Sequence, residues 1–216
     1  MNYRLAKILA RKKYEADAVE PIDINLQDPV SQMVIISERL GFGGSNELGH
    51  PAKCIPKIEL IDGSDVLYSL SGVEAQAVDF YHNKREPANR RTGLTGSYDS
   101  QVILMNFGRV LWDPMLAWDP KKFTNPQLKI SIDLDASEAS TTALYMTVLA
   151  YIFDEKMITP SGFLMHKEIK SWSLADGTHE YTDLPTDYPY RKLFLRAQEY
   201  DAGPIDQIEQ IKLSED

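Results

Sequence analysis

The sequence has few of the residues that catalyse reactions, cross-link a chain or span a membrane. It contains one cysteine, Cys54, so no internal disulfide can form, and we interpret this residue as a buried thiol rather than a reactive one. The longest apolar run, Ala143–Phe153, has about half the length that a bilayer crossing requires. We find no secretory signal, and we expect a soluble chain made in the cytoplasm.

Histidine is also scarce, and its spacing does not predict a metal centre. No two histidines lie within five residues of each other, and His50, four residues before Cys54, is a single pair without the further ligands that a zinc site requires. A cupin-type metal site needs two close histidines with a carboxylate nearby, and His166 beside Glu168 is the best remnant of that pattern. We therefore assign no metal ligand and no cofactor. The four histidines are His50, His82, His166 and His179.

Motifs for covalent or phosphate chemistry are missing as well. The sequence has no Gly-x-Ser-x-Gly elbow, and the glycines after Leu40 do not have the spacing of a phosphate-binding loop. Asp133 and Asp135 could bind a cation or flank a glycosidic bond, but such acids more commonly solvate the end of a strand. We assign no catalytic residue and expect no enzymatic activity. A cupin-like or glycosidase-type enzyme remains the weakest alternative.

What is present is an ordinary globular composition with an uneven charge. The chain has 216 residues, of which 43% are hydrophobic, and a net charge of −9. This size fits one large all-β domain, or one domain with extensions. Residues 1–14 contain five basic residues and no acid, so the rest of the chain carries about −14. The negative body argues against binding nucleic acid over the whole surface.

The basic N-terminal segment is the candidate interaction site. Its apolar residues recur at helical spacing between basic ones, which predicts a short amphipathic helix. Such a helix could dock by its apolar face, or act as an arm that contacts a lipid membrane or packaged nucleic acid. The candidate residues are Arg4, Leu5, Lys7, Ile8, Leu9, Arg11, Lys12 and Lys13.

The remainder of the sequence predicts many short strands and one convincing internal helix, Val73–His82. We therefore predict an all-β fold, a jelly-roll β-sandwich or barrel with the N-terminal helix and one or two helices in loops. We divide the chain into an arm at 1–29, a jelly-roll domain at 30–189, and final strands at 190–216 that could begin a second, truncated jelly roll. The expected strands are Val30–Leu40, a hairpin of Cys54–Ile61 and Val66–Leu70, Gln101–Phe107, Gln127–Asp135, Thr141–Phe153, Lys167–Leu174, Tyr190–Ala197 and Ile205–Leu213.

One connection, Phe107–Phe123, is unusually rich in aromatic residues and closed by prolines. Rings with so much area usually bury themselves, so we expect them to brace two sheets from the interior. The alternative is that Trp112 and Trp118 form a sugar-stacking platform. In that case the protein would be a carbohydrate-binding or adhesion module of a phage.

Several segments together resemble a known family. The hairpin beginning Ile58-Glu-Leu-Ile, the helix with Glu74-Ala-Gln-Ala, and the corner with Phe107-Gly-Arg, Trp118-Asp and Phe123-Thr-Asn-Pro-Gln-Leu are similar to the first barrel of double jelly-roll major capsid proteins. That family builds tailless icosahedral viruses, especially lipid-containing phages. Two full barrels need a longer chain, so this sequence would be a fragment or a single-barrel relative.

The resemblance implies a non-enzymatic structural protein of the virion. The subunit would form homotrimers that act as pseudo-hexameric capsomers of an icosahedral shell. Its partners would be its own copies, neighbouring capsomers and other virion proteins. The N-terminal segment would face an internal membrane or a neighbouring capsomer.

Overall fold

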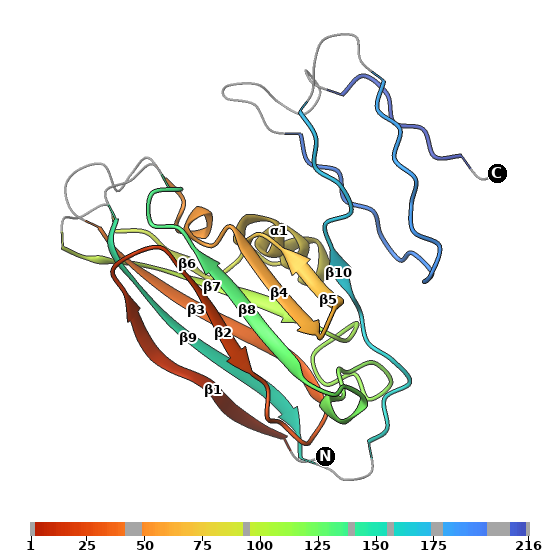
Figure 1. The fold of residues 1–216 in the computed structure, drawn as a ribbon, viewed down its shortest axis with the longest axis horizontal. Coiled ribbons are helices and arrows are strands. Elements are labelled where there is room, and N and C mark those ends of the chain that lie inside the picture. Colours follow the sequence, from red (N-terminus) through yellow and green to blue (C-terminus); the bar gives the residue numbers. More distant parts are fainter. Residues whose placement is uncertain are drawn as a thin grey trace. The chain divides into compact units, whose positions relative to one another are not determined.

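The computed structural model describes residues 3–41, 49–92, 96–137, 141–154, 158–173, 179–197 and 208–214. The chain divides into two compact units, residues 1–167 and 168–216. All regular elements of the described ranges lie in the first unit (Figure 1). They are β1 (Tyr3–Tyr14), β2 (Ala18–Asp23), β3 (Val30–Gly41), η2 (Pro51–Cys54), β4 (Lys57–Asp62), β5 (Asp65–Leu70), α1 (Gly72–Asn83), β6 (Asn89–Arg90), β7 (Tyr98–Asn106), η3 (Pro120–Lys122), β8 (Pro126–Ile132), β9 (Thr141–Phe153) and β10 (His166–Lys167).

The strands form two sheets that face each other as a sandwich (Figure 1). The first, sheet A, has the order β1-β9-β3-β7-β6, and the second, sheet B, has the order β10-β5-β4-β8-β2. Only the short β10 pairs in parallel, with β5, and the other pairings are antiparallel. Without the two-residue strands β6 and β10, the orders are 1-9-3-7 and 2-8-4-5. Two four-stranded sheets interleaved in this way are a jelly roll. The predicted fold class is confirmed.

Alternating sequence creates the core between the sheets. In β8 every second residue is buried, and the same period holds along most of β7 and β9 and in the second half of β3. The buried residues meet in one apolar cluster. Its fully enclosed members include Met33, Ile35, Ile58, Leu60, Ile103, Met105, Leu128, Ile130 and Val148.

Local chemistry fixes the hairpin and the internal helix. Gly63 turns the β4–β5 hairpin with a φ of +61°, a left-handed conformation that glycine adopts without strain. Helix α1 begins with a capping box, in which Ser71 accepts from the Glu74 amide and the Glu74 carboxylate accepts from the Ser71 amide. The hairpin and the helix lie where the sequence predicts them.

The predicted N-terminal helix is wrong, because Tyr3–Tyr14 is strand β1 at the edge of sheet A. Two β-bulges interrupt its pairing with β9, one between Lys7 and Leu9 and one between Leu9 and Lys12. Each bulge inserts a residue and shifts the two-residue alternation. The apolar residues therefore fall at intervals that imitate a helix in the sequence.

The second unit contains no regular secondary structure in its described residues. The strand expected at Tyr190–Ala197 is therefore wrong. The strands expected at Lys167–Leu174 and Ile205–Leu213 are also absent from 168–173 and 208–213. Their remaining residues lie outside the described ranges, apart from Lys167, which ends β10. A strand pattern needs a neighbour for its backbone groups, and no pairing partner is present within these ranges. A second jelly roll beginning near residue 190 stays a prediction.

Candidate interaction surface

The candidate residues of the N-terminal segment divide between two faces of β1. Ala6, Ile8 and Leu9 are partly buried and pack against the core cluster. Leu5 is 52% exposed, and Lys7 is also exposed. The segment is thus an integral strand of the jelly roll with one solvent-facing side.

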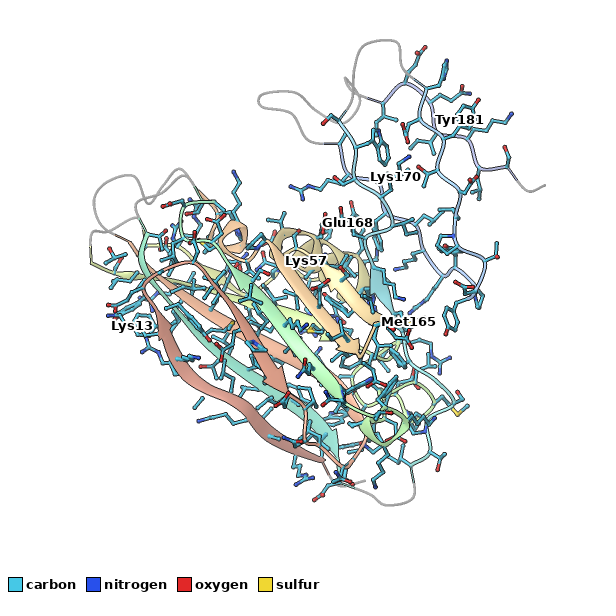
Figure 2. The ribbon with its side chains drawn as sticks, in the orientation of Figure 1. Lys13, Lys57, Met165, Glu168, Lys170 and Tyr181 are labelled. Atoms are coloured by element: carbon cyan, nitrogen blue, oxygen red, sulfur yellow. The ribbon has the colours of Figure 1, made fainter. Side chains whose placement is uncertain are left out.

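Most cations of β1 are held by carboxylates of neighbouring segments. Arg4 donates to Asp28 at 2.6 Å, and Lys12 pairs with Glu20 at 2.7 Å. Lys13, at the end of the strand, pairs with Glu15 (Figure 2). Exposed pairs of this kind contribute little stability each, but they neutralise the charge that a basic arm would offer to an anionic partner. Contact with lipid or nucleic acid through these residues stays a prediction.

Arg11 makes the most elaborate contact on this strand. Its Nε donates to Glu38 at 2.6 Å, and its guanidinium carbon lies 3.8 Å from the centre of the Tyr145 ring. The ring of Tyr98 meets Tyr145 edge-on. The hydrogen bond to Glu38 raises the pKa of Arg11 above its ordinary value. A cation stacked on one ring and fixed by an acid is held in place.

Lys7 differs from the other four cations. Among the described residues it has no ion pair and no aromatic partner. It follows Leu5 and Tyr3 on the exposed side of the strand, since alternate residues share a face. This side of β1 therefore combines apolar groups with one unneutralised positive charge.

The aromatic corner is largely interior, as the sequence predicts. Trp118 is fully buried and stacks with Phe107, at 5.8 Å between ring centres, and with Phe123, at 5.7 Å. Val30 and Trp118 exchange two backbone hydrogen bonds, which tie the corner to the start of β3. A buried ring offers no face to a sugar, so the proposed platform of Trp112 and Trp118 is wrong with respect to Trp118.

Trp112 occupies a different position from Trp118. Its φ is +67°, an uncommon left-handed conformation for a bulky residue, and its amide donates to the Ser31 hydroxyl at 2.8 Å. The indole stacks on Tyr3, with 3.8 Å between ring centres, and meets Tyr151 and Phe153 edge-on. These contacts join the corner to the first residue of β1.

Asp113 holds the backbone of the corner together. Its buried carboxylate accepts from the Arg109 amide and guanidinium, and from the amides of Met115 and Leu116. The hydrogen bond from the Arg109 side chain is the main reason why the pKa of Asp113 lies well below its usual range. One carboxylate thus fixes the loop that follows β7.

An exposed apolar surface results at this end of the jelly roll. We call it the corner patch and define it as Tyr3, Leu5, Val110, Leu111 and Met115. Each side chain is 41–64% exposed. The stacking of Tyr3 on Trp112 places the start of β1 at the loop to which Val110, Leu111 and Met115 belong. Several large exposed apolar residues in one place are a usual mark of a contact surface. Sequence reasoning missed Val110, Leu111 and Met115, because the exposed side of a loop has no periodicity.

The residues considered for catalysis lie apart and have structural roles. Asp133 follows β8 and accepts from the amides of Asp135 and Ala136, which is a local turn rather than a carboxylate pair on a strand. Cys54 is fully buried, as predicted, and burial raises its pKa. No group of three potential metal ligands occurs in the described ranges.

A groove of about 190 Å³ lies between residues 23–27 and 120–126. Its walls are mostly loop residues at the ends of β2 and η3. The described chain also has no helix of the length and apolarity needed to traverse a bilayer.

Comparison with known proteins supports the fold. No family model and no curated protein matches the sequence. The crystal structure of the major capsid protein of Sulfolobus turreted icosahedral virus matches with a TM-score of 0.51 and 14% identity, over 71% of this chain and 49% of that one. The PBCV-1 virus capsid matches at 0.47 and 13%, over 71% and 43%. The major capsid protein of bacteriophage PM2 matches at 0.46 and 12%, over 69% and 50%.

The resemblance to double jelly-roll capsid proteins is thus confirmed at the level of the fold. The fold assignment depends on the first of these structures together with the strand order. This chain spans about half the length of the structures that it matches.

Proposed function

We propose that this protein is a structural subunit of a viral capsid, which acts by self-association rather than catalysis. The observation that carries the proposal is the jelly-roll strand order, together with the similarity to the capsid protein of Sulfolobus turreted icosahedral virus. An identity of 14% supports a shared fold, and the function is our inference from it. The rigid two-sheet body, the corner without reactive groups and the exposed corner patch suit a subunit that makes lateral contacts.

In the proposed role the subunit resides in the virion. It associates as a homotrimer, and the trimers contact neighbouring capsomers and other virion proteins. A pseudo-sixfold capsomer made of three subunits needs two jelly-roll barrels at each subunit position. The described elements of this chain form one barrel. The proposal therefore includes a second barrel, supplied either by a continuation of the chain or by another subunit.

Electron microscopy of the purified chain, at increasing concentration, tests this function. We expect closed or sheet-like assemblies whose repeating unit has threefold symmetry. A particle-free monomer at all concentrations, combined with specific binding on a glycan array, would instead establish an adhesion module. Bound transition metal in the purified protein would favour a cupin-like enzyme.

A further inference from the structure

The second unit, residues 168–216, has an unusual surface. None of its described residues is buried, yet it contains many large apolar side chains. Tyr181 is 86% exposed, Tyr188 64% and Leu195 54%. Disordered segments are typically poor in aromatic residues, and this one is not. The described residues of this segment form no core of their own, and exposed apolar groups in this number favour burial against a partner.

The charge of this segment indicates which partner it fits. Residues 168–216 contain eleven acids and five bases, and residues 179–190 contain three acids and no lysine or arginine. Lys170 pairs with Glu180 and donates to the Tyr181 carbonyl at 3.2 Å (Figure 2). Asp183 and Asp187 have no ion pair within the described ranges. The partner surface should therefore be apolar and positively charged.

The exposed side of β1 has these properties. It carries Tyr3 and Leu5 of the corner patch and the unpaired cation Lys7. Sheet B presents a different outer surface, where Lys57 lies within reach of Glu59 and Lys129 pairs in register with Glu59. The acidic, tyrosine-rich stretch 179–190 is complementary to the first surface in both charge and apolarity.

The backbone edge of β1 is a poor alternative for this contact. Its two bulges interrupt the ladder, and its lysines and arginines line the edge. Both features are known devices that prevent strand addition at a sheet edge. Side-chain docking on the face of β1 is therefore favoured over pairing at its edge.

We propose that residues 179–195 of one copy dock onto the corner patch and Lys7 of a second copy. The inference depends on the proposed function, because it supplies a contact for self-association. Leu195 and the tyrosines bury their apolar area against Leu111 and Met115. Asp183 and Asp187 lie against Lys7. Every subunit carries both surfaces, so the contact runs head to tail and closes into a ring or extends into a lattice.

Sedimentation velocity on full-length single variants tests the docking. We expect Met115→Asp and Leu195→Asp each to weaken self-association at least about tenfold, because each places a charge in an apolar contact. The matched control is Val19→Asp, since Val19 is 60% exposed but lies on β2 of sheet B. This variant should associate as the wild type does. Lys7→Glu should weaken association, and combining it with Asp187→Lys should restore part of the loss.

Cross-linking identifies the two partners directly. A Met115→Cys chain mixed with a Leu195→Cys chain and a short bismaleimide should give a covalent heterodimer, whereas either variant alone should not. The native Cys54 is fully buried and does not compete.

The outcomes separate this inference from the proposed function. A wild type that stays monomeric contradicts the function itself. A wild type that associates, with Met115→Asp and Leu195→Asp associating equally well, overturns the docking alone. Cross-linking only within a doubly substituted chain also overturns it. The docking is likewise overturned if Met115→Asp associates normally but no longer sediments with phosphatidylglycerol vesicles, because the corner patch would then be a lipid-binding surface.

Discussion

Asp113 is the residue whose loss should disturb the aromatic corner most. Replacing it by asparagine removes the charge that Arg109 and three backbone amides share, at a site that is 3% exposed. We expect the free energy of unfolding to fall by about 2 kcal/mol in urea denaturation. Asp119→Asn is the control, since Asp119 accepts only from the Lys121 amide in a more exposed turn. Equal effects of the two substitutions would contradict this role.

The same residue predicts a dependence of stability on pH. The pKa of Asp113 is depressed in the folded protein, chiefly by the hydrogen bond from Arg109. Its stabilisation is therefore complete above the ordinary aspartate pKa of about 4, and it is lost as the pH falls further towards the folded value. Asp113→Asn should show a smaller loss of stability than the wild type between about pH 4 and pH 2. If the wild type and Asp113→Asn lost stability equally as the pH falls, another carboxylate would be responsible for the loss at acidic pH.

Arg39 and Asp99 form a buried ion pair inside the sandwich. The guanidinium donates to Asp99 at 2.7 Å and to the Gly49 carbonyl at 3.0 Å, and both side chains are almost fully enclosed. Arg39→Met should lower the free energy of unfolding by about 3 kcal/mol, because it leaves a buried carboxylate without a cation and with only Thr92 as a donor. The double variant with Asp99→Leu should recover much of that loss in the same urea titration. No recovery would mean that packing rather than charge pairing decides the effect.

At the scale of elements, β1 decides whether the N-terminus is a free arm or part of the sandwich. Leu9→Ala should lower the free energy of unfolding by about 1–2 kcal/mol, since Leu9 packs against the core. Lys7→Ala, two residues away on the exposed side, should change it by less than about 0.5 kcal/mol. Thermal unfolding measures both. A free arm would leave the stability unchanged in each case.

The elements that were predicted well from the sequence are those in which the spacing of apolar residues is regular or the end of the element has a clear local signal. β8 alternates strictly, α1 has a capping sequence, and β9 is a long β-branched and aromatic run, so local pattern was sufficient for each. β1 was predicted as a helix because its bulges depend on pairing with β9, some 140 residues away. The sequence around β1 does not show that it pairs with β9.

The candidate site could be predicted only in part, for a similar reason. The basic residues of the N-terminus are visible in the sequence, but their acidic partners come from other segments, as with Arg11 and Glu38. The aromatic corner was predicted to lie in the interior, and the buried position of Trp118 confirms this prediction. The stacking of Trp112 on Tyr3 joins residues that are 109 positions apart in the sequence, and no spacing rule reveals it.

At the scale of the whole molecule, one chain combines a jelly roll with a second unit that has no buried residue in its described ranges. The jelly roll has a buried apolar core and the described part of the second unit has none, so the two units should differ in whether they fold independently. The jelly roll should fold by itself, whereas we expect the exposed apolar residues in the described part of the second unit to become buried when copies associate. Self-association is thus the property on which the proposed function depends.

Sedimentation velocity of the unmodified chain over a wide concentration range tests self-association most directly. We expect the monomer of 24.5 kDa to convert, with rising concentration, to trimers and larger species. A single monomeric boundary at every concentration, with the jelly roll folded by circular dichroism, would contradict it.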